Sequence, residues 1–280
     1  KIYVAPGNGG TAKEQKVENI KIEADDIDGL LNFAQLQNIN LTIIGPEAPL
    51  VMGIVDRFIA AGLPCFGPKA EAAQLEGSKS FTKDFLKRHG IPTADYSSFN
   101  ELEPAITYIK SKGAPIVVKA DGLAAGKGVI VAMTEEEAIT AVEDILEAKS
   151  FGEAGSKIVI EEFLEGEEAS YIVVTDGTEV LPLATSQDHK ARDNNDLGPN
   201  TGGMGAYSPA PIITASLDER VMNEIINPTL AGLKKDGIDY SGFLYAGLMI
   251  DKDGNPKILE YNCRFGDPET QPIMMRLKSD

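Results

Sequence analysis

Residues 116–131 read IVVKADGLAAGKGVIV, a lysine-bearing, glycine-studded turn between two apolar, β-branched runs. Strand alternation places Val117 and Lys119 on one face of the first run, which brings a cation beside the turn. The glycines allow backbone N–H groups to converge on an anion, and Lys127 adds a second positive charge. The stretch therefore predicts a phosphate-binding loop. A β-hairpin with a flexible tip is the alternative, because glycine-rich matches alone do not decide between the two.

Composition limits the class of protein. The chain has 280 residues, 42% of them hydrophobic, which is enough to bury a sizeable core in two or three domains. Its 26 Lys and Arg face 43 Asp and Glu, and the net charge of −17 disfavours nonspecific binding to nucleic acid or to anionic membranes. Any phosphate site must therefore be built locally.

Cysteine usage and the two ends of the sequence indicate its setting. Cys65 and Cys263 match no zinc or redox spacing, and without a signal peptide we expect a reducing, cytoplasmic location. No apolar run is long enough to span a membrane. The sequence opens at Lys1 within a strand-like segment and stops without a terminating signal, so we expect a fragment of a longer chain.

Residues 1 to about 76 alternate between strand and helix patterns. Strands are expected at 2–4, 41–44 and 63–66, with helices at 27–34 and 51–61. This order predicts a βαβαβ unit with a parallel sheet that binds ligands at the carboxyl ends of its strands.

Glu47 lies in the segment GPEAPL (45–50), at one of these strand ends. A carboxylate there is placed to read a hydroxyl-bearing ligand. The alternative is that the segment is simply a rigid, proline-rich turn.

Residues 78–89 predict a helix that Ser78 caps and Gly90 ends. Lys79 lies in its first turn, where a cation opposes the helix dipole and so hints at a bound anion. A solvated surface lysine is the alternative interpretation. A further helix is expected at 100–112.

The opening stretch begins a predicted small α+β module. It is followed by a helix for which Thr134 and Glu137 form a capping box, and then by two strands at 157–164 and 169–176. The bend between these strands is rich in carboxylates, which suit the sugar and base of a nucleotide.

A long polar segment at 186–211 is rich in Gly, Asn and Pro. Such a long loop in a compact domain is usually functional, although a disordered surface excursion is the alternative. An amphipathic segment follows near 217–233. Strands are then expected at 243–251 and 257–262.

The last strand carries a candidate metal site. Its period of two places Glu260 and Asn262 on one face with Tyr261 opposite, so that a carboxylate and an amide oxygen can reach one cation. Such oxygens suit Mg²⁺, which takes few protein ligands when phosphates supply the rest. The alternative is a polar, solvent-facing strand end.

Arg264 follows the strand on the same parity. Its guanidinium would lie near a transferring phosphate or a substrate carboxylate, unless it pairs with Asp267 instead. Together with Lys79, Lys119 and Lys127, these residues describe Mg-ATP chemistry.

These motifs together resemble the phosphoribosylamine–glycine ligase family of the ATP-grasp superfamily. The resemblance covers essentially the whole chain, and several long matches in order are far more specific than any one motif. The matching segments are residues 4–8, 45–50, 77–79, 119–128, 187–190, 198–209 and 260–269.

The resemblance implies an α/β and α+β architecture. Residues 1–76 would form a pre-ATP-grasp, Rossmann-like parallel-sheet domain that lacks its first strand and glycine-rich loop. Residues 77–280 would form a two-part ATP-grasp domain, with a small lid at about 95–161 and a larger antiparallel-sheet half. ATP would lie between the two sheets.

The resemblance also implies roles for individual residues. Lys119 and Arg264 would act on the reacting groups, and Glu260 with Asn262 would hold Mg²⁺ or Mn²⁺. The implied ATP-binding residues are Lys79, Lys119, Asp121, Gly122, Ala125, Gly126, Lys127, Gly128, Glu161, Glu162, Phe163, Leu164 and Glu168. The implied substrate-binding residues are Glu47, Asp188, Lys190, Asn200, Thr201, Gly202 and Gly203.

The implied activity is the ATP-dependent ligation of glycine to 5-phosphoribosylamine in purine biosynthesis, through a glycyl phosphate. Its partners would be small molecules, without nucleic acid or membrane, and the protein would be a monomer. Two alternatives remain at this point. One is a nucleotide-binding fragment that does not turn over, and the other is an ATP-grasp ligase for a different acid and amine.

Overall fold

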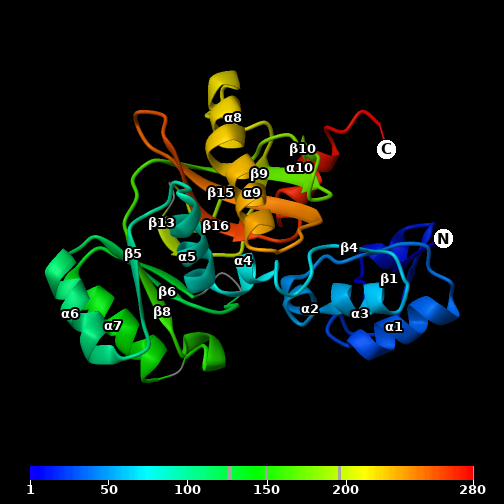
Figure 1. The fold of residues 1–280 in the computed structure, drawn as a ribbon, viewed down its shortest axis with the longest axis horizontal. Helices are drawn as coiled ribbons and strands as arrows, with labels where there is room; N and C mark the ends of the chain where they lie inside the picture. Colours follow the sequence, from blue (N-terminus) through cyan, green and yellow to red (C-terminus); the bar gives the residue numbers. More distant parts are fainter. Residues whose placement is uncertain (125–127, 149, 195–196, 280) are drawn as a thin grey trace.

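The computed structural model describes residues 1–124, 128–148, 150–194 and 197–279. Figure 1 shows three parts: the first 76 residues at one end, a small sheet with two helices at the other, and a larger sheet with its helices between them. No helix within the described residues is both long and apolar enough to cross a membrane.

The N-terminal part alternates short strands and helices, as expected. Its strands pair in parallel, β1 with β2 and β3 with β4, but they form two separate two-stranded sheets rather than one. With only two or three residues each, these strands form short ladders. The elements are β1 (Ile2–Val4), η1 (Thr11–Lys13), β2 (Val17–Asn19), α1 (Ile27–Leu36), β3 (Thr42–Ile43), α2 (Glu47–Val51), α3 (Ile54–Ala60) and β4 (Cys65–Phe66).

The single helix expected at 51–61 is wrong. Gly53 adopts φ +86°, a left-handed conformation that interrupts the helix and separates α2 from α3. The segment 45–50 is likewise not only a turn, because α2 begins at Glu47 directly after the extended Pro46. This start places Glu47 in the first turn of α2.

The small sheet has the order β5-β8-β6-β7 and is antiparallel throughout. Its helices α6 and α7 pack on one face, where Ile116 and Val118 contribute to a separate hydrophobic core. The expected capping box at Thr134 and Glu137 is present. The elements are β5 (Tyr96–Phe99), α6 (Leu102–Lys112), β6 (Ile116–Ala120), β7 (Val129–Ala132), α7 (Glu135–Leu146), η2 (Gly152–Gly155) and β8 (Ile158–Glu162). We call residues 95–161 the lid.

The large sheet has the order β10-β9-β15-β16, again antiparallel. Strand β9 belongs to this sheet and not to the small one. The expectation that strand 169–176 belongs to the same α+β module as the opening stretch is therefore wrong. Strand alternation cannot tell which sheet a strand joins, because the pattern is the same in both. The elements are β9 (Glu167–Thr175), β10 (Val180–Pro182), β15 (Gly242–Ile250) and β16 (Pro256–Asn262).

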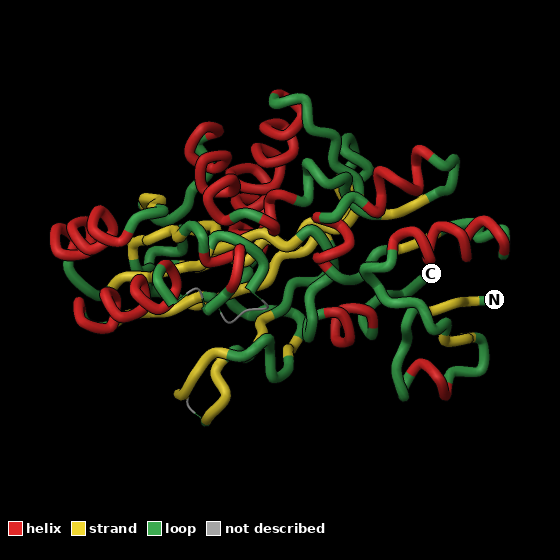
Figure 2. The backbone as a smooth tube through the Cα atoms, turned by 90° about the horizontal axis from the view of Figure 1, so that it is seen from below, coloured by secondary structure: helices red, strands yellow, loops and turns green. Residues whose placement is uncertain are grey.

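Helices cover one face of the large sheet and build the main core with it. Phe85, Tyr171, Leu230, Leu244 and Tyr261 belong to this core. Figure 2 shows helices above the central strands and the short strands of the loop 186–211 below them. The elements are α4 (Gln74–Gly77), α5 (Lys79–His89), α8 (Ala215–Val221), the π-helical η3 (Met222–Ile226), α9 (Asn227–Lys235), α10 (Thr270–Met274), β11 (Gln187–Asp188), β12 (Ala191–Asp193), β13 (Leu197–Asn200) and β14 (Ala206–Tyr207).

The chain enters and leaves the lid at closely packed points. On entry, Thr93 forms a parallel bridge with Ile258 of β16. On exit, Gly166 passes against the end of β15, where an added Cβ would overlap the carbonyl oxygen of Ile250. These contacts fix the lid beside the strand that carries the candidate metal ligands.

Candidate functional site

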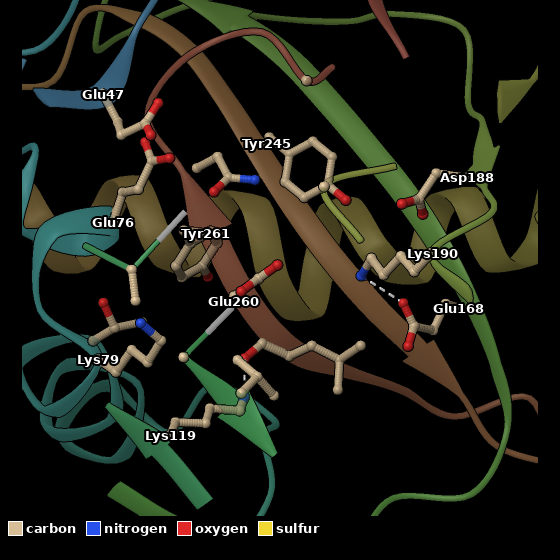
Figure 3. A pocket seen from close by; sticks show the side chains of 18 of the residues that line it. Glu47, Glu76, Lys79, Lys119, Glu168, Asp188, Lys190, Tyr245, Glu260 and Tyr261 are labelled. Carbon is tan, nitrogen blue, oxygen red and sulfur yellow. Dashed lines mark hydrogen bonds and ion pairs between the residues drawn. The ribbon is translucent and has the colours of Figure 1, made fainter. Parts of the chain in front are cut away.

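A cavity of about 660 Å³ lies where the lid, the large sheet and the N-terminal part meet (Figure 3). Side chains enter it from elements far apart in sequence. Figure 3 shows Lys79 and Lys119 on one side, Glu47 and Glu76 on another, and Lys190 with Glu168 across from them, around Glu260. The cavity therefore gathers most of the residues selected from sequence.

Lys119 projects into the cavity from β6, and Val117 lies on the same strand face, as predicted. The Nζ atom of Lys119 lies 3.0 Å from Glu161 Oε1, and Lys83 Nζ lies 2.8 Å from Glu161 Oε2. The three side chains are at most 8% exposed. Burial lowers the pKa of Lys83 to about 8. We call Lys83, Lys119 and Glu161 the lysine cluster.

The loop after β6 is held against the N-terminus of α5. Asp121 accepts hydrogen bonds from Ser80 N at 2.5 Å and Ser78 Oγ at 3.1 Å, so this carboxylate helps to cap the helix. Lys79 donates from Nζ to Gly122 O at 3.1 Å, and burial lowers its pKa. The first turn of α5 and the loop are therefore one unit.

Two glycines of this loop are required by packing. An added Cβ at Gly122 would lie 2.9 Å from Ala154 Cα, and one at Gly128 would lie 2.6 Å from Ala124 Cβ. The expected phosphate contacts of Ala125, Gly126 and Lys127 lie outside the described residues. The strands on either side form an antiparallel hairpin, so the two interpretations of the opening stretch are compatible.

Glu260 and Asn262 share one face of β16, and Tyr261 lies opposite in the core, where its hydroxyl contacts Thr229 Oγ1 at 2.5 Å. The predicted alternation is confirmed. Glu260 makes no hydrogen bond or ion pair with any residue that the structure describes. Burial by itself would raise its pKa, but the surrounding Lys190, Lys119 and Lys79 lower it. The carboxylate is therefore ionised and has no direct partner in the part of the chain that the structure describes.

Arg264 forms its ion pairs with Glu47 and Glu76, so the alternative pairing with Asp267 is not the one found among the described residues. Its Nη2 lies 3.0 Å from Glu76 Oε1, and its Nε lies 3.5 Å from Glu47 Oε2. The carboxylates come from α4 and α2, which pack beside the end of β16 only in the folded chain. We call Arg264, Glu47 and Glu76 the arginine cluster.

Glu76 connects the arginine cluster to the candidate metal site. Its Oε2 accepts from Cys263 N at 2.7 Å, and the amide of Asn262 is oriented so that its nitrogen donates to Glu76 Oε1 at 2.9 Å. That orientation leaves the amide oxygen of Asn262 for another partner. Burial raises the pKa of Glu76 to about 7, although Arg264 opposes the shift.

A third group lies across the cavity on the large sheet. Lys190 Nζ contacts Glu168 Oε2 at 2.6 Å, beside Asp188. Burial raises the pKa of Asp188 to about 6, although Lys190 lowers it. Behind them Ser170 donates to Glu269 Oε1 at 2.9 Å and contacts Tyr245 Oη at 3.1 Å.

The remaining residues selected from sequence lie at different depths. Thr201 and Gly202 line the cavity, whereas Gly203 packs against Pro268. The backbone of Asn200 ends β13, and its side chain is outside the description. Glu162, Phe163 and Leu164 line the cavity beside the lid exit, whereas Glu161 points into the lysine cluster rather than outward.

Sequence reasoning did not select Lys83, Glu76, Tyr245 or Glu269, which all line the cavity. Lys83 follows Lys79 by four residues on the predicted helix, so helical spacing could have found it. Glu76 carries no such signal, because its partners are distant in sequence.

Comparison with known proteins matches both parts of the chain. The model of the phosphoribosylglycinamide synthetase N domain matches residues 1–76, and that of the phosphoribosylglycinamide synthetase ATP-grasp (A) domain matches residues 77–270. A phosphoribosylamine–glycine ligase from Vibrio vulnificus (strain YJ016) is 67% identical over 279 residues, covering 100% of this chain and 65% of that protein. The chain thus spans about 65% of the length of the curated relatives it matches.

Solved structures agree with this match. The crystal structure of phosphoribosylamine–glycine ligase from Thermotoga maritima has a TM-score of 0.82 and 36% identity, and covers 98% of this chain and 66% of that one. The biotin carboxylase domain of Hydrogenobacter thermophilus 2-oxoglutarate carboxylase, solved with MgADP, has a TM-score of 0.70 and 19% identity, covering 92% and 56%. At this identity, the second likeness concerns the fold alone.

Proposed function

Because this chain belongs to the phosphoribosylglycinamide synthetase family, we propose that it carries the site of an ATP-dependent ligase that joins glycine to 5-phosphoribosylamine. The products would be glycinamide ribonucleotide, ADP and phosphate, in purine biosynthesis. The observation that carries the proposal is the ionised Glu260, which has no direct partner among the described residues and has lysine ammonium groups around it in one cavity. A nucleotide with its metal ion supplies the complementary charges.

The cavity suits the charges of ATP. Lys79 and Lys119 would stabilise the phosphates, because ammonium groups in a partly buried site interact strongly with an anion. Phe163 and Leu164 provide an apolar border beside the lid exit for adenine. Glu168 would contact the ribose after exchanging its ion pair with Lys190 for a hydroxyl.

The candidate metal residues fit a hard divalent cation such as Mg²⁺ or Mn²⁺. A free carboxylate on Glu260 and an amide oxygen on Asn262 match the oxygen preference of these ions, and phosphates and water would complete the shell. Among the described residues, no group of three or more His, Cys, Asp and Glu could hold a metal by itself. The bound ion would neutralise phosphate charge during transfer.

The proposed chemistry has two steps. A glycine carboxylate oxygen attacks the γ-phosphorus in line, the bond to the β-phosphate oxygen breaks, and ADP leaves. The amine nitrogen of phosphoribosylamine then attacks the carbonyl carbon, expels phosphate and loses a proton. Lys119 and Arg264 would stabilise the charge that develops on the transferring group, which is the main task of such a site.

The residues for glycine and phosphoribosylamine would lie on the two sides of Glu260. Glu47, Asp188 and Lys190 offer charged groups for an amine, a hydroxyl or a carboxylate. Thr201 and Gly202 also line the cavity and would add polar contacts, and Thr201 Oγ1 donates to Lys190 O at 2.9 Å.

The test is ADP release by the purified protein with ATP, Mg²⁺, glycine and freshly made phosphoribosylamine, each omitted in turn. We expect ADP formation that requires both glycine and the amine, with glycinamide ribonucleotide formed in equal amount. ATP binding without amine-dependent ADP would contradict the proposal and indicate a nucleotide-binding part without turnover. ADP formation with a different acid would indicate another ligase.

A further inference from the structure

Lys83 is a buried cation in the middle of α5, and its side chain is only 2% exposed. Its Nζ lies 2.8 Å from Glu161 Oε2 and donates to Thr93 Oγ1 at 2.7 Å. Thr93 in turn donates to Ile258 O on β16 at 2.7 Å. Lysine is almost never fully buried unless it is paired, and a buried ion pair is weak evidence of a stabilising role. The position of Lys83 therefore calls for an explanation beyond stability.

Glu161 divides its carboxylate between two lysines. Oε2 faces Lys83, and Oε1 faces Lys119 at 3.0 Å. Because two ammonium groups share one carboxylate, the cluster carries a surplus of positive charge. Lys119 lies at the cavity wall, where its Nζ also donates to Leu259 O at 3.3 Å, next to Glu260. The surplus is thus available to a ligand in the cavity.

The arrangement would change if Lys83 lost its charge. Glu161 would then keep Lys119 as its one ion-pair partner among the residues described by the structure. The two charges would cancel, and the Lys119 ammonium would be held by a full carboxylate in a poorly hydrated site. An anion in the cavity would gain less from Lys119.

We propose that Lys83 is a positioning residue of the nucleotide site, which balances Glu161 so that Lys119 remains available to the phosphates of ATP. The proposal rests on the proposed function, because it requires ATP to bind in this cavity. Lys83 acts through Glu161 and Lys119, and it links the lid entry at Thr93 to both. Its effect therefore falls on ATP rather than on glycine.

The first test compares Lys83→Met with Lys83→Arg and with Lys87→Met, an exposed lysine one turn later on the same helix. The ATP dissociation constant is measured by calorimetry, and KM values for ATP and glycine by ADP release at pH 7. We expect Lys83→Met to raise both ATP constants about tenfold, because one positive charge is lost from a buried cluster. Lys83→Arg keeps the charge, so its ATP constants should rise less than those of Lys83→Met. The glycine KM and the Lys87→Met variant stay within about twofold of wild type.

The second test is a charge rescue by the double variant Lys83→Met/Glu161→Gln. It removes one cation and one anion, so the cluster keeps the same net charge as in the wild type. We expect the ATP dissociation constant of the double variant to return to within about threefold of the wild-type value. Each single variant, by contrast, changes the net charge of the cluster by one. A role of Lys83 in folding alone would leave the double variant at least as impaired as Lys83→Met.

The outcomes separate this inference from the proposed function. ATP constants of Lys83→Met within about twofold of wild type, or no recovery in the double variant, would overturn the role of Lys83 while wild-type ligation stands. A wild-type protein that binds no ATP would overturn both. If Lys83→Met is too unstable to assay, Lys83→Arg and the double variant decide the question.

Discussion

The lysine cluster and the arginine cluster border the same cavity with opposite imbalances of charge. In the lysine cluster two ammonium groups share the carboxylate of Glu161. In the arginine cluster the carboxylates of Glu47 and Glu76 share one guanidinium. The lysine cluster therefore favours an anion, and the arginine cluster favours a cation once Glu76, whose pKa burial raises to about 7, is ionised. We therefore expect the phosphates to bind mainly on the lysine side, whereas the other side, apart from Arg264 itself, suits a cation or an amine.

The clusters also differ in burial. The lysine cluster is at most 8% exposed, whereas Arg264 is 20% and Glu47 is 32% exposed. Charges interact more strongly where water is excluded. We therefore expect larger functional effects from the lysine cluster, and uneven effects within the arginine cluster.

Lys119→Met should give the largest effect of the variants considered. It removes the ammonium group at the cavity wall and leaves Glu161 with Lys83 as its one ion-pair partner within the described ranges. We expect kcat/KM for ATP to fall about 1000-fold, because charge on the transferring phosphate loses a positioned donor. Steady-state ADP release measures this, with the exposed Lys110→Met on α6 as the matched control. A fall of less than about tenfold would contradict the assignment of phosphates to the lysine side.

The arginine cluster offers a paired test of stability. Glu76→Ala removes the partner of Arg264, Cys263 N and Asn262 at a site where Glu76 is 7% exposed. We expect the free energy of unfolding to drop by about 3 kcal/mol, because buried donors and a charge lose their partner. Glu47→Ala removes a longer, more exposed contact and should cost about 1 kcal/mol or less. Urea unfolding measures both, and equal losses would show that burial does not separate these carboxylates.

Asp188 gives a small expected effect, comparable with that of Glu47, and tests burial in a carboxylate with a lysine neighbour. Its pKa is raised to about 6, above the unfolded value of 3.8, so the folded state binds the proton more tightly. Stability from this group is present at low pH and is lost as pH rises from 4 to 6. Asp188→Asn lacks this loss. We expect the free energy of unfolding of this variant, relative to that of the wild type, to increase by about 1 kcal/mol from pH 4 to pH 7, allowing for solvent screening.

Unfolding curves at several pH values measure this difference. The exposed Asp253→Asn is the matched control and should parallel wild type. An Asp188→Asn curve that also parallels wild type would show that Lys190 cancels the effect of burial on the carboxyl group.

Local patterns predicted much of what surrounds the cavity. Strand alternation correctly placed Lys119 and Val117 together on the cavity side. It also placed Glu260 on the cavity side and Tyr261 on the opposite side, in the core, because strand geometry alone decides this. The helix start at Ser78 was predicted for the same reason, since a cap is a local interaction.

What could not be predicted depends on contacts between distant segments. Arg264 pairs with Glu47 and Glu76 rather than with Asp267, because packing of α2 and α4 brings those carboxylates within reach. The sheet to which β9 belongs and the pairing of Lys83 with Glu161 also depend on contacts between distant segments, so local patterns could not predict them. The break at Gly53 had a local signal, but a glycine inside a helical pattern does not by itself end the helix.

Gly166 at the lid exit also has an evolutionary consequence. Its neighbour there is the backbone of Ile250, which substitution of side chains cannot remove. Any descendant sequence in which the chain still passes this close to the backbone of Ile250 is therefore restricted to glycine at position 166, however far its surface has diverged. In a remote relative, the residue aligned with Gly166 would show whether the chain still leaves the lid along the same path.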